Sequence, residues 1–182
     1  MRKTLLLTLV LVLGATVALA QAPNGSIGIF ADNAGVSCNL PSAAGIQYYY
    51  FVHVNALGAT ASQWAAPKPD CLTGTRLSDL AVFAINIGTS DVGITVGYPS
   101  CKTGTFHILT ALYSVVSATP CCYFSVVPDP YLPSGKIEIP DCDFNLTYGT
   151  SGQGILESGP TCDCNVPVED TTWGQMKALY TD

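Results

Sequence analysis

Along most of this chain, apolar residues alternate with small or polar ones over short stretches. Residues 46–55 are dense in Tyr, Phe and Val, and residues 105–116 repeat the pattern. β-Branched and aromatic residues with a period of two are typical of strands, and the Gly, Pro, Asn and Ser between the stretches are typical of turns. The sequence therefore predicts about nine short strands, drawn from ten stretches: residues 26–31, 46–55, 59–65, 82–87, 92–98, 105–116, 122–127, 136–139, 144–148 and 154–157.

This spacing predicts an all-β fold, an antiparallel sandwich or barrel, and we expect a β-sandwich. Within residues 46–55, alternation sends Tyr48 and Tyr50 to one face and Tyr49 and Phe51 to the other. One pair should be core. The other is either covered as well or forms an exposed aromatic strip that can stack on a sugar or a protein. Trp64 offers the same choice between a buried anchor and a binding platform.

The beginning of the chain has a different pattern. Arg2 and Lys3 precede an uncharged apolar run, residues 5–20, which closes on the small residues Ala18 and Ala20. This arrangement predicts a cleavable secretory signal over residues 1–20. The run is shorter than the roughly 20 apolar residues of a transmembrane anchor, and no later stretch is long enough to span a bilayer.

The end of the chain predicts a short helix instead of a strand. Trp173, Met176 and Tyr180 fall on one face of about two helical turns, which Asp170 or Thr171 can cap. So short a helix is marginal alone, and we expect it to dock on the domain or on a partner. The expected organisation is a signal over residues 1–20, a β-domain over 21–163, and a linker with a helical tail over 164–182.

The composition narrows the class of function. Charged residues make up 11% of the chain, well below the roughly 25% usual for soluble domains. The net charge is −6, and the mature chain is more acidic because the signal holds two of the seven basic residues. Nucleic acids and anionic membranes are therefore excluded as partners, since both need clustered Lys and Arg.

All the cysteines follow the signal. An even number in an exported chain predicts disulfides, with partial pairing or a metal site as the alternatives, although the C-x-x-C spacing of zinc sites is absent. The adjacent Cys121 and Cys122 would point to opposite faces of a strand, so we expect them to bond in two directions and not to each other. The eight are Cys38, Cys71, Cys101, Cys121, Cys122, Cys142, Cys162 and Cys164.

Few residues offer acid–base or metal chemistry, and no cofactor is expected. His53 and His107 lie within predicted strands and are interpreted as structural. Asp129, Asp141 and Asp143 are close in sequence, and loop carboxylates of this kind can be solvated, can hold Ca²⁺ or can form a glycosidase pair. Asp141 and Asp143 do not have the spacing of a calcium loop, which makes them weak metal candidates.

Two resemblances add to this picture. Residues 45–156 resemble a cohesin-like β-sandwich, through residues 58–64 after an aromatic strand and through the later strand 104–113. Cohesins bind dockerins and usually carry no such set of cysteines. The chain is also similar to secreted cysteine-rich bacterial β-sandwich proteins, through residues 27–32, 120–123 and the tail 168–180, which has the form T-W-G-x-x-K-x-L-Y. That likeness implies export and a sorting or attachment role for the tail.

Three functions remain open. The first is a secreted or surface-associated structural or adhesive protein without enzymatic activity, attached or sorted by its tail. Its partner would be a cell-surface component, another copy of the chain or a glycan. The second is an extracellular carbohydrate- or protein-binding module that uses Tyr48–Phe51 and Trp64. The third is a hydrolase that uses loop carboxylates.

Overall fold

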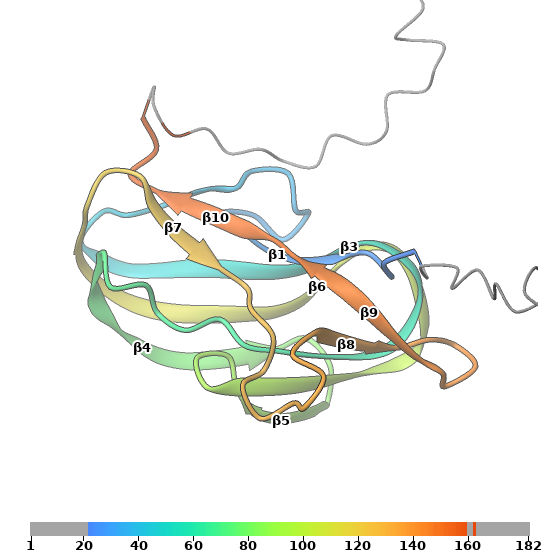
Figure 1. Ribbon diagram of the computed structural model, residues 1–182. Coiled ribbons are helices and arrows are strands. Elements are labelled where there is room, and N and C mark those ends of the chain that lie inside the picture. The colour runs from blue at the N-terminus through green and yellow to red at the C-terminus, as the bar shows by residue number, and fades with distance from the viewer. Residues whose placement is uncertain (1–21, 160–161, 163–182) are drawn as a thin grey trace, which may run out of the picture.

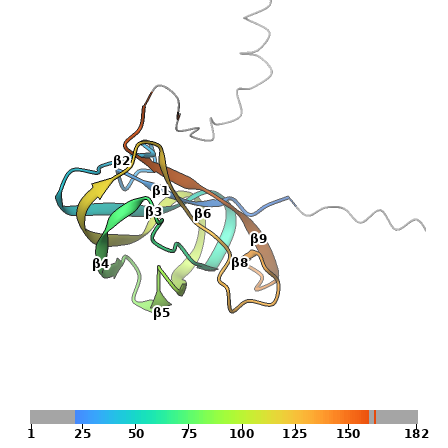
Figure 2. The ribbon, with the colours of Figure 1, turned by 60° about the vertical axis from the view of Figure 1, so that its left-hand side comes forward.

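Two long strands organise the fold, β3 (Gly45–Trp64) and β6 (Gly93–Ala118), which pair antiparallel. They belong to a computed structural model of the chain, which describes residues 22–159 and residue 162 (Figure 1). Each strand joins two stretches that the sequence predicts as separate, because pairing continues at Ala56 and Ala59. The register shifts four times between Phe51 and Ala61, and such bulges let a strand bend. Figures 1 and 2 show both strands curving round one end of the molecule.

Eight further strands complete two sheets. The larger has the order β1-β9-β8-β3-β6-β4, with β5 also on β6, and the smaller has the order β2-β10-β7. Their bounds are β1 Ser26–Phe30, β2 Asn39–Leu40, β4 Leu72–Ala81, β5 Ile85–Thr89, β7 Cys122–Ser125, β8 Ile137–Pro140, β9 Leu146–Ser151 and β10 Gln153–Leu156.

The all-β prediction is confirmed, but the purely antiparallel sandwich is wrong in two respects. The strand β1 pairs with both β3 and β9, which closes a ring of paired strands through β8. The β1–β9 and β2–β10 pairings are also parallel. At Gly152 the chain passes from β9 in the larger sheet to β10 in the smaller. A Cβ there would lie 2.7 Å from the Cα of Gly28, so only glycine permits this crossing.

The sequence gives no signal for β4. Its residues include Gly74, Arg76 and Asp79, which lower strand propensity, so the sequence pattern predicts no strand over residues 72–81. Hydrogen bonds to β6 along its length stabilise β4 as a strand despite this low local propensity.

An aromatic cluster fills the core between the sheets. Phe51 stacks on Trp64 with ring centroids 4.7 Å apart, and Tyr49 lies 5.3 Å from Tyr113. Phe124, on β7 of the smaller sheet, meets Tyr49, Phe51 and Tyr113 edge-on. All five side chains are fully buried, so Tyr49 and Phe51 are the core pair of the alternating strand.

Three disulfides join the described residues, Cys71–Cys122, Cys101–Cys142 and Cys121–Cys162. Cys38 is disulfide-bonded as well. The neighbouring Cys121 and Cys122 bond to different partners, as predicted, although Cys121 lies in the turn before β7 with a positive φ and not on the strand itself. The bridge from Cys71, directly before β4, to Cys122 links the larger sheet to β7 of the smaller one.

The expected signal and the expected helical tail both lie outside the described residues. Within residues 22–159 the structure contains no helix, and hence none with the length and apolarity to cross a bilayer.

Candidate interaction surface

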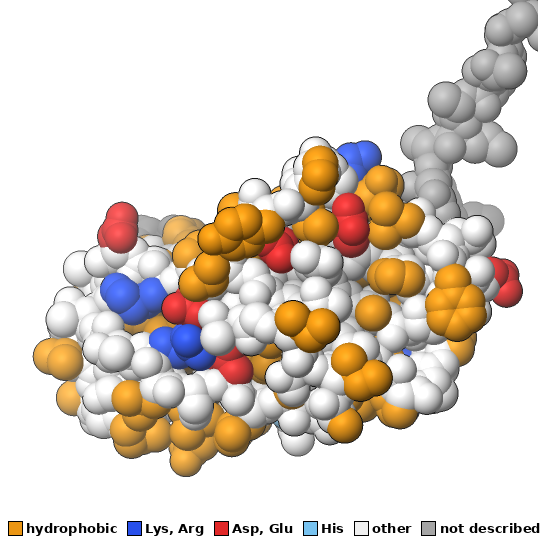
Figure 3. All heavy atoms as spheres, turned by 90° about the horizontal axis from the view of Figure 1, so that it is seen from below, with side chains coloured by type: hydrophobic (Ala, Val, Ile, Leu, Met, Phe, Trp, Pro, Cys, Tyr) orange, Lys and Arg blue, Asp and Glu red, His pale blue; other side chains and the backbone are white. Residues whose placement is uncertain are grey.

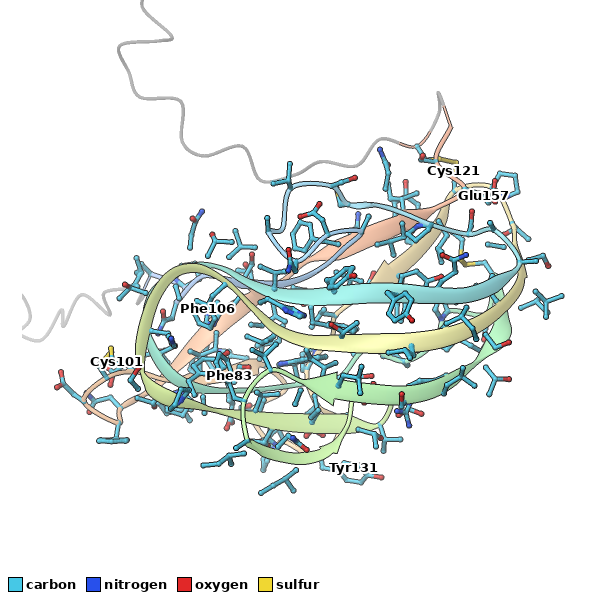
Figure 4. All side chains as sticks on the ribbon, turned by 180° about the vertical axis from the view of Figure 1, so that it is seen from behind. Phe83, Cys101, Phe106, Cys121, Tyr131 and Glu157 are labelled. Carbon is cyan, nitrogen blue, oxygen red and sulfur yellow. A yellow bond between two sulfur atoms is a disulfide. The ribbon has the colours of Figure 1, made fainter. Side chains whose placement is uncertain are left out.

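The outward side of β3, β6 and β4 forms a continuous surface, which we call the outer face. Residues directly opposite each other on antiparallel strands share a face, so the register defines its rows. Figure 4 looks onto this side of the molecule, with β3, β6 and β4 in front. The outer face has three rows: Ile46, Ser114 and Thr75; Tyr48, Leu112 and Ser78; and Tyr50, Thr110 and Leu80.

Apolar and hydroxyl side chains are mixed across the outer face. Ile46, Tyr48 and Leu80 are about half exposed, at 50%, 46% and 53%, and Leu77 is equally exposed at the adjacent bulge of β4. Ser and Thr hydroxyls lie between them. Tyr50 is partly buried because its ring meets His107 at 5.5 Å. A contiguous apolar area of this kind, interleaved with hydrogen-bonding groups, is typical of a surface that contacts another molecule.

The outer face carries no charge. The only charged residues of β3, β4, β5 and β6 are Arg76, Asp79 and Lys102. Lys102 lies over the ring of Phe83, away from the three rows. Figure 3, which views the molecule from below, shows charged side chains in a few small groups with hydrophobic ones spread between them. Such a surface offers shape and hydrogen bonding for contact, with little electrostatic steering.

Arg76 and Asp79 pair with each other instead of facing a ligand. Arg76 Nη1 lies 3.2 Å from Asp79, and its Nε lies 3.0 Å from Asp91. The Asp79 carboxylate also accepts hydrogen bonds from the backbone N–H and the hydroxyl of Ser90. Burial alone would raise the pKa of Asp91, but the hydroxyl of Thr89 and the charge of Arg76 outweigh it and lower that pKa. These groups hold the β5–β6 turn against β4.

The structure divides the aromatic residues that the sequence proposed for ligand binding. Tyr49, Phe51 and Trp64 have no exposed surface, so the suggestion that they contact a ligand is wrong. Their packing in the core is the physical reason. Tyr48 and Tyr50 lie on the outer face, where a ligand can reach Tyr48 directly. Sequence reasoning missed Thr75, Ser78 and Leu80 because it missed β4 itself.

Both histidines take part in structural hydrogen bonds. The ring of His53 is fully buried between the Tyr98 hydroxyl, at 3.1 Å, and the backbone carbonyl of Asn24, at 2.9 Å. His107 contacts the carbonyl of Leu109. Burial lowers the pKa of both rings, although their backbone contacts act in the opposite direction, so both are neutral at pH 7.

The candidate carboxylates accept hydrogen bonds from nearby groups, mostly within local turns. Asp141 accepts the backbone N–H groups of Asp143 and Asn145, and these bonds lower its pKa although burial acts the other way. Asp141 and Asp143 line a shallow hollow of about 350 Å³ beside Asn24 and Gly58. Asp129 is buried and accepts from Gln63 and from the N–H of Tyr131. No group of three or more His, Cys, Asp or Glu in the described part of the chain is arranged to hold a metal.

Trp173, Met176 and Tyr180, expected to dock the tail, lie outside the described residues, as does Cys164.

Comparisons with known proteins give similarities of fold only. No family model matches the chain, and no curated protein matches it either. Solved structures similar to it include a cohesin module from a family 33 glycoside hydrolase of Clostridium perfringens ATCC13124, at 5% identity over 76% of this chain and 100% of that one, with a TM-score of 0.49. A non-cellulosomal cohesin from the archaeon Archaeoglobus fulgidus is 12% identical over 74% and 91% of the two chains, with a TM-score of 0.47. The bacterial hydrophobin BslA is 12% identical over 77% and 100%, with a TM-score of 0.37.

Proposed function

We propose that the chain is an exported, non-enzymatic structural or adhesive protein that contacts its partner through the outer face. The observation that carries this proposal is the uncharged surface of β3, β6 and β4, on which exposed Ile46, Tyr48 and Leu80 lie among hydroxyl groups. The disulfides support localisation outside the cytoplasm, because such bonds persist in oxidising compartments.

The outer face is tested by placing charge on it. We expect the double change Tyr48→Lys and Leu80→Lys to weaken retention of the purified mature protein on the washed surface fraction of its producing cells by about tenfold or more, because a buried unpaired ammonium opposes contact. Val36→Lys is the matched control, since Val36 is 69% exposed in the loop after β1. Equal retention of the double variant and the control would contradict the proposal.

We also propose that the tail, residues 168–182, attaches or sorts the protein. The motif T-W-G-x-x-K-x-L-Y in this segment supports this role by resemblance. A chain that ends at Pro167 should fold normally, because the described β-strands all precede it, and should be released into the medium. Unchanged cell association of the truncated chain would exclude a sorting role.

A carbohydrate-binding module is the second candidate function. The specific observation in its favour is Tyr48, an exposed ring in the middle row of the outer face, opposite Leu112 and with the hydroxyls of Ser114 and Thr110 in the adjoining rows. Aromatic rings stack on sugar faces while hydroxyls bond to sugar hydroxyls. A glycan array probed with the mature chain and with Tyr48→Ala separates the two candidates. A glycan that binds the parent chain but not the variant would favour this second function.

A further inference from the structure

Two asparagines of the chain stand in the N-x-S/T sequon of N-linked glycosylation, Asn24 in N-G-S and Asn145 in N-L-T. The sequon supplies the two groups that an oligosaccharyltransferase needs, the asparagine amide and a hydroxyl two residues later. An attached glycan is bulky and hydrophilic, so a folded chain can carry one only where the amide is at the surface. The structure distinguishes the two sequons on this criterion.

The side chain of Asn24 is buried and its amide is fully hydrogen-bonded. Asn24 is 4% exposed, and its Nδ2 donates to the backbone carbonyl of Gly58 at 2.6 Å and to the hydroxyl of Thr147 at 3.1 Å. Its Oδ1 accepts the backbone N–H of Leu57 at 2.9 Å. A sugar on Nδ2 would replace one of the two donated hydrogens and would have to fit inside the domain. A chain glycosylated at Asn24 therefore could not adopt this fold.

Asn145 is exposed, in the turn between β8 and β9. The Cys101–Cys142 disulfide fixes this turn at the curved end of β3 and β6, where Figure 4 labels Cys101. The Asp141 carboxylate accepts the backbone N–H of Asn145 at 2.8 Å, and Nδ2 of Asn145 lies 3.2 and 3.4 Å from its two oxygens. A glycosylated amide keeps one N–H, which can still donate to this carboxylate, so the turn tolerates the modification.

An exposed aromatic ring directly beside Asn145 offers a surface for the first sugar. Phe144 is 81% exposed and has a φ of 63°, in the left-handed region that a bulky side chain seldom adopts. In the bare chain, this ring therefore combines an unfavourable backbone conformation with little burial. The apolar face of a sugar attached to the next residue can pack on such a ring.

We propose that Asn145 carries an N-linked glycan and that Asn24 does not. The inference rests on the proposed export of the chain, because N-glycans are found on exported proteins. The co-reactant is an oligosaccharide joined to a lipid through pyrophosphate. Nδ2 of Asn145 forms a bond to C1 of the first sugar as the bond from C1 to the pyrophosphate oxygen breaks. The lipid pyrophosphate leaves with the electron pair of that bond, and Nδ2 releases one proton.

The burial of Thr147 sets the order of glycosylation and folding. Its hydroxyl, which completes the sequon, accepts from Asn24 and donates to the backbone carbonyl of Ile139, and the residue is 4% exposed. A transferase that must contact this hydroxyl therefore acts before β9 pairs with β8. After folding, the glycan projects from the curved end of β3 and β6, away from the three rows of the outer face, so it leaves that surface open.

Mass spectrometry of the mature chain, purified from its producing cells and their medium, tests the inference. We expect an intact mass that exceeds the mass of the polypeptide by that of an oligosaccharide, and peptide mapping should place the sugar on the peptide that holds Asn145. Asn145→Gln should abolish the added mass while keeping an amide near Asp141. Asn33→Gln is the matched control and should keep the added mass, because Asn33 is an exposed loop asparagine with Gly35 at the position of the sequon hydroxyl.

Thermal unfolding tests the packing of Phe144 on the sugar. We expect Phe144→Ala to lower the melting temperature of the glycosylated chain by about 1–4 °C and to leave that of the Asn145→Gln chain unchanged. Equal shifts in the two backgrounds would contradict this packing.

Three results would overturn the glycosylation site: an intact mass equal to that of the polypeptide, sugar on the peptide that holds Asn24, or added mass that persists in Asn145→Gln. An unmodified chain that is nevertheless found outside the cytoplasm would refute the glycan and leave the proposed function standing. A chain that stays in the cytoplasm would refute both.

Discussion

Phe51 and Tyr48 are three residues apart on β3, yet the structure predicts very different costs for their removal. Phe51 is fully buried, stacks on Trp64 at 4.7 Å and meets Phe124 edge-on. Replacing a buried Phe with Ala removes its apolar burial and leaves a cavity, at a cost of about 3–5 kcal/mol. Tyr48 is 46% exposed on the outer face, so Tyr48→Ala should cost about 1 kcal/mol or less.

Thermal unfolding of the oxidised chain measures this difference. In a domain of this size each kcal/mol shifts the melting temperature by about 2–4 °C, so Phe51→Ala should lower it by roughly 6–20 °C and Tyr48→Ala by at most about 4 °C. The two variants are matched because each removes one aromatic ring from the same strand. Equal losses in both would show that the two faces of β3 are equally buried, and would refute the exposed outer face.

Two further predictions concern protonation and covalent links. Burial lowers the pKa of His53 and His107 in the folded chain, so the unfolded chain takes up protons first as the pH falls below the ordinary histidine value of 6.5. The free energy of unfolding should therefore be constant above pH 6.5. Below that pH it should fall by up to about 1.4 kcal/mol per pH unit for each histidine, until the folded-state pKa is reached. Denaturant melts that give the same free energy of unfolding at every pH between 7.5 and 5 would be inconsistent with buried neutral rings. The described residues hold the disulfides Cys71–Cys122, Cys101–Cys142 and Cys121–Cys162. Peptide mapping under non-reducing conditions should recover all three, and a bond between the neighbours Cys121 and Cys122 would contradict the structure.

Much of the fold follows from local pattern. Period-two alternation in residues 46–55 identifies a strand and divides its aromatic residues between two faces, since successive side chains on a strand point in opposite directions. The even number of cysteines predicts disulfides, and the adjacent pair Cys121 and Cys122 predicts two directions of bonding. These conclusions need no knowledge of which segments meet, because each depends on residues that are close in sequence.

Which face is core is not a local property. Tyr49 and Phe51 are buried because Phe124 from β7 and Trp64 from the far half of β3 pack against them, and periodicity alone cannot distinguish them from Tyr48 and Tyr50. The same applies to β4, whose glycine and charged residues give a loop-like pattern until β6 supplies its hydrogen bonds. Consequently the outer face could be predicted only in part, through Tyr48 and Tyr50.

The sequence by itself determined the strand-rich class, the low charge of the surface and the presence of disulfide cross-links. Only the tertiary structure decided which segments meet: the cysteine pairs that close, the parallel contact of β1 with β9, and the rows of the outer face. The physical reason is that alternation and composition act over a few residues, whereas pairing joins segments as far apart as Ser26 and Thr150. Such contacts form because they bury the most apolar surface while satisfying backbone hydrogen bonds, a requirement of the whole chain and not of any one segment.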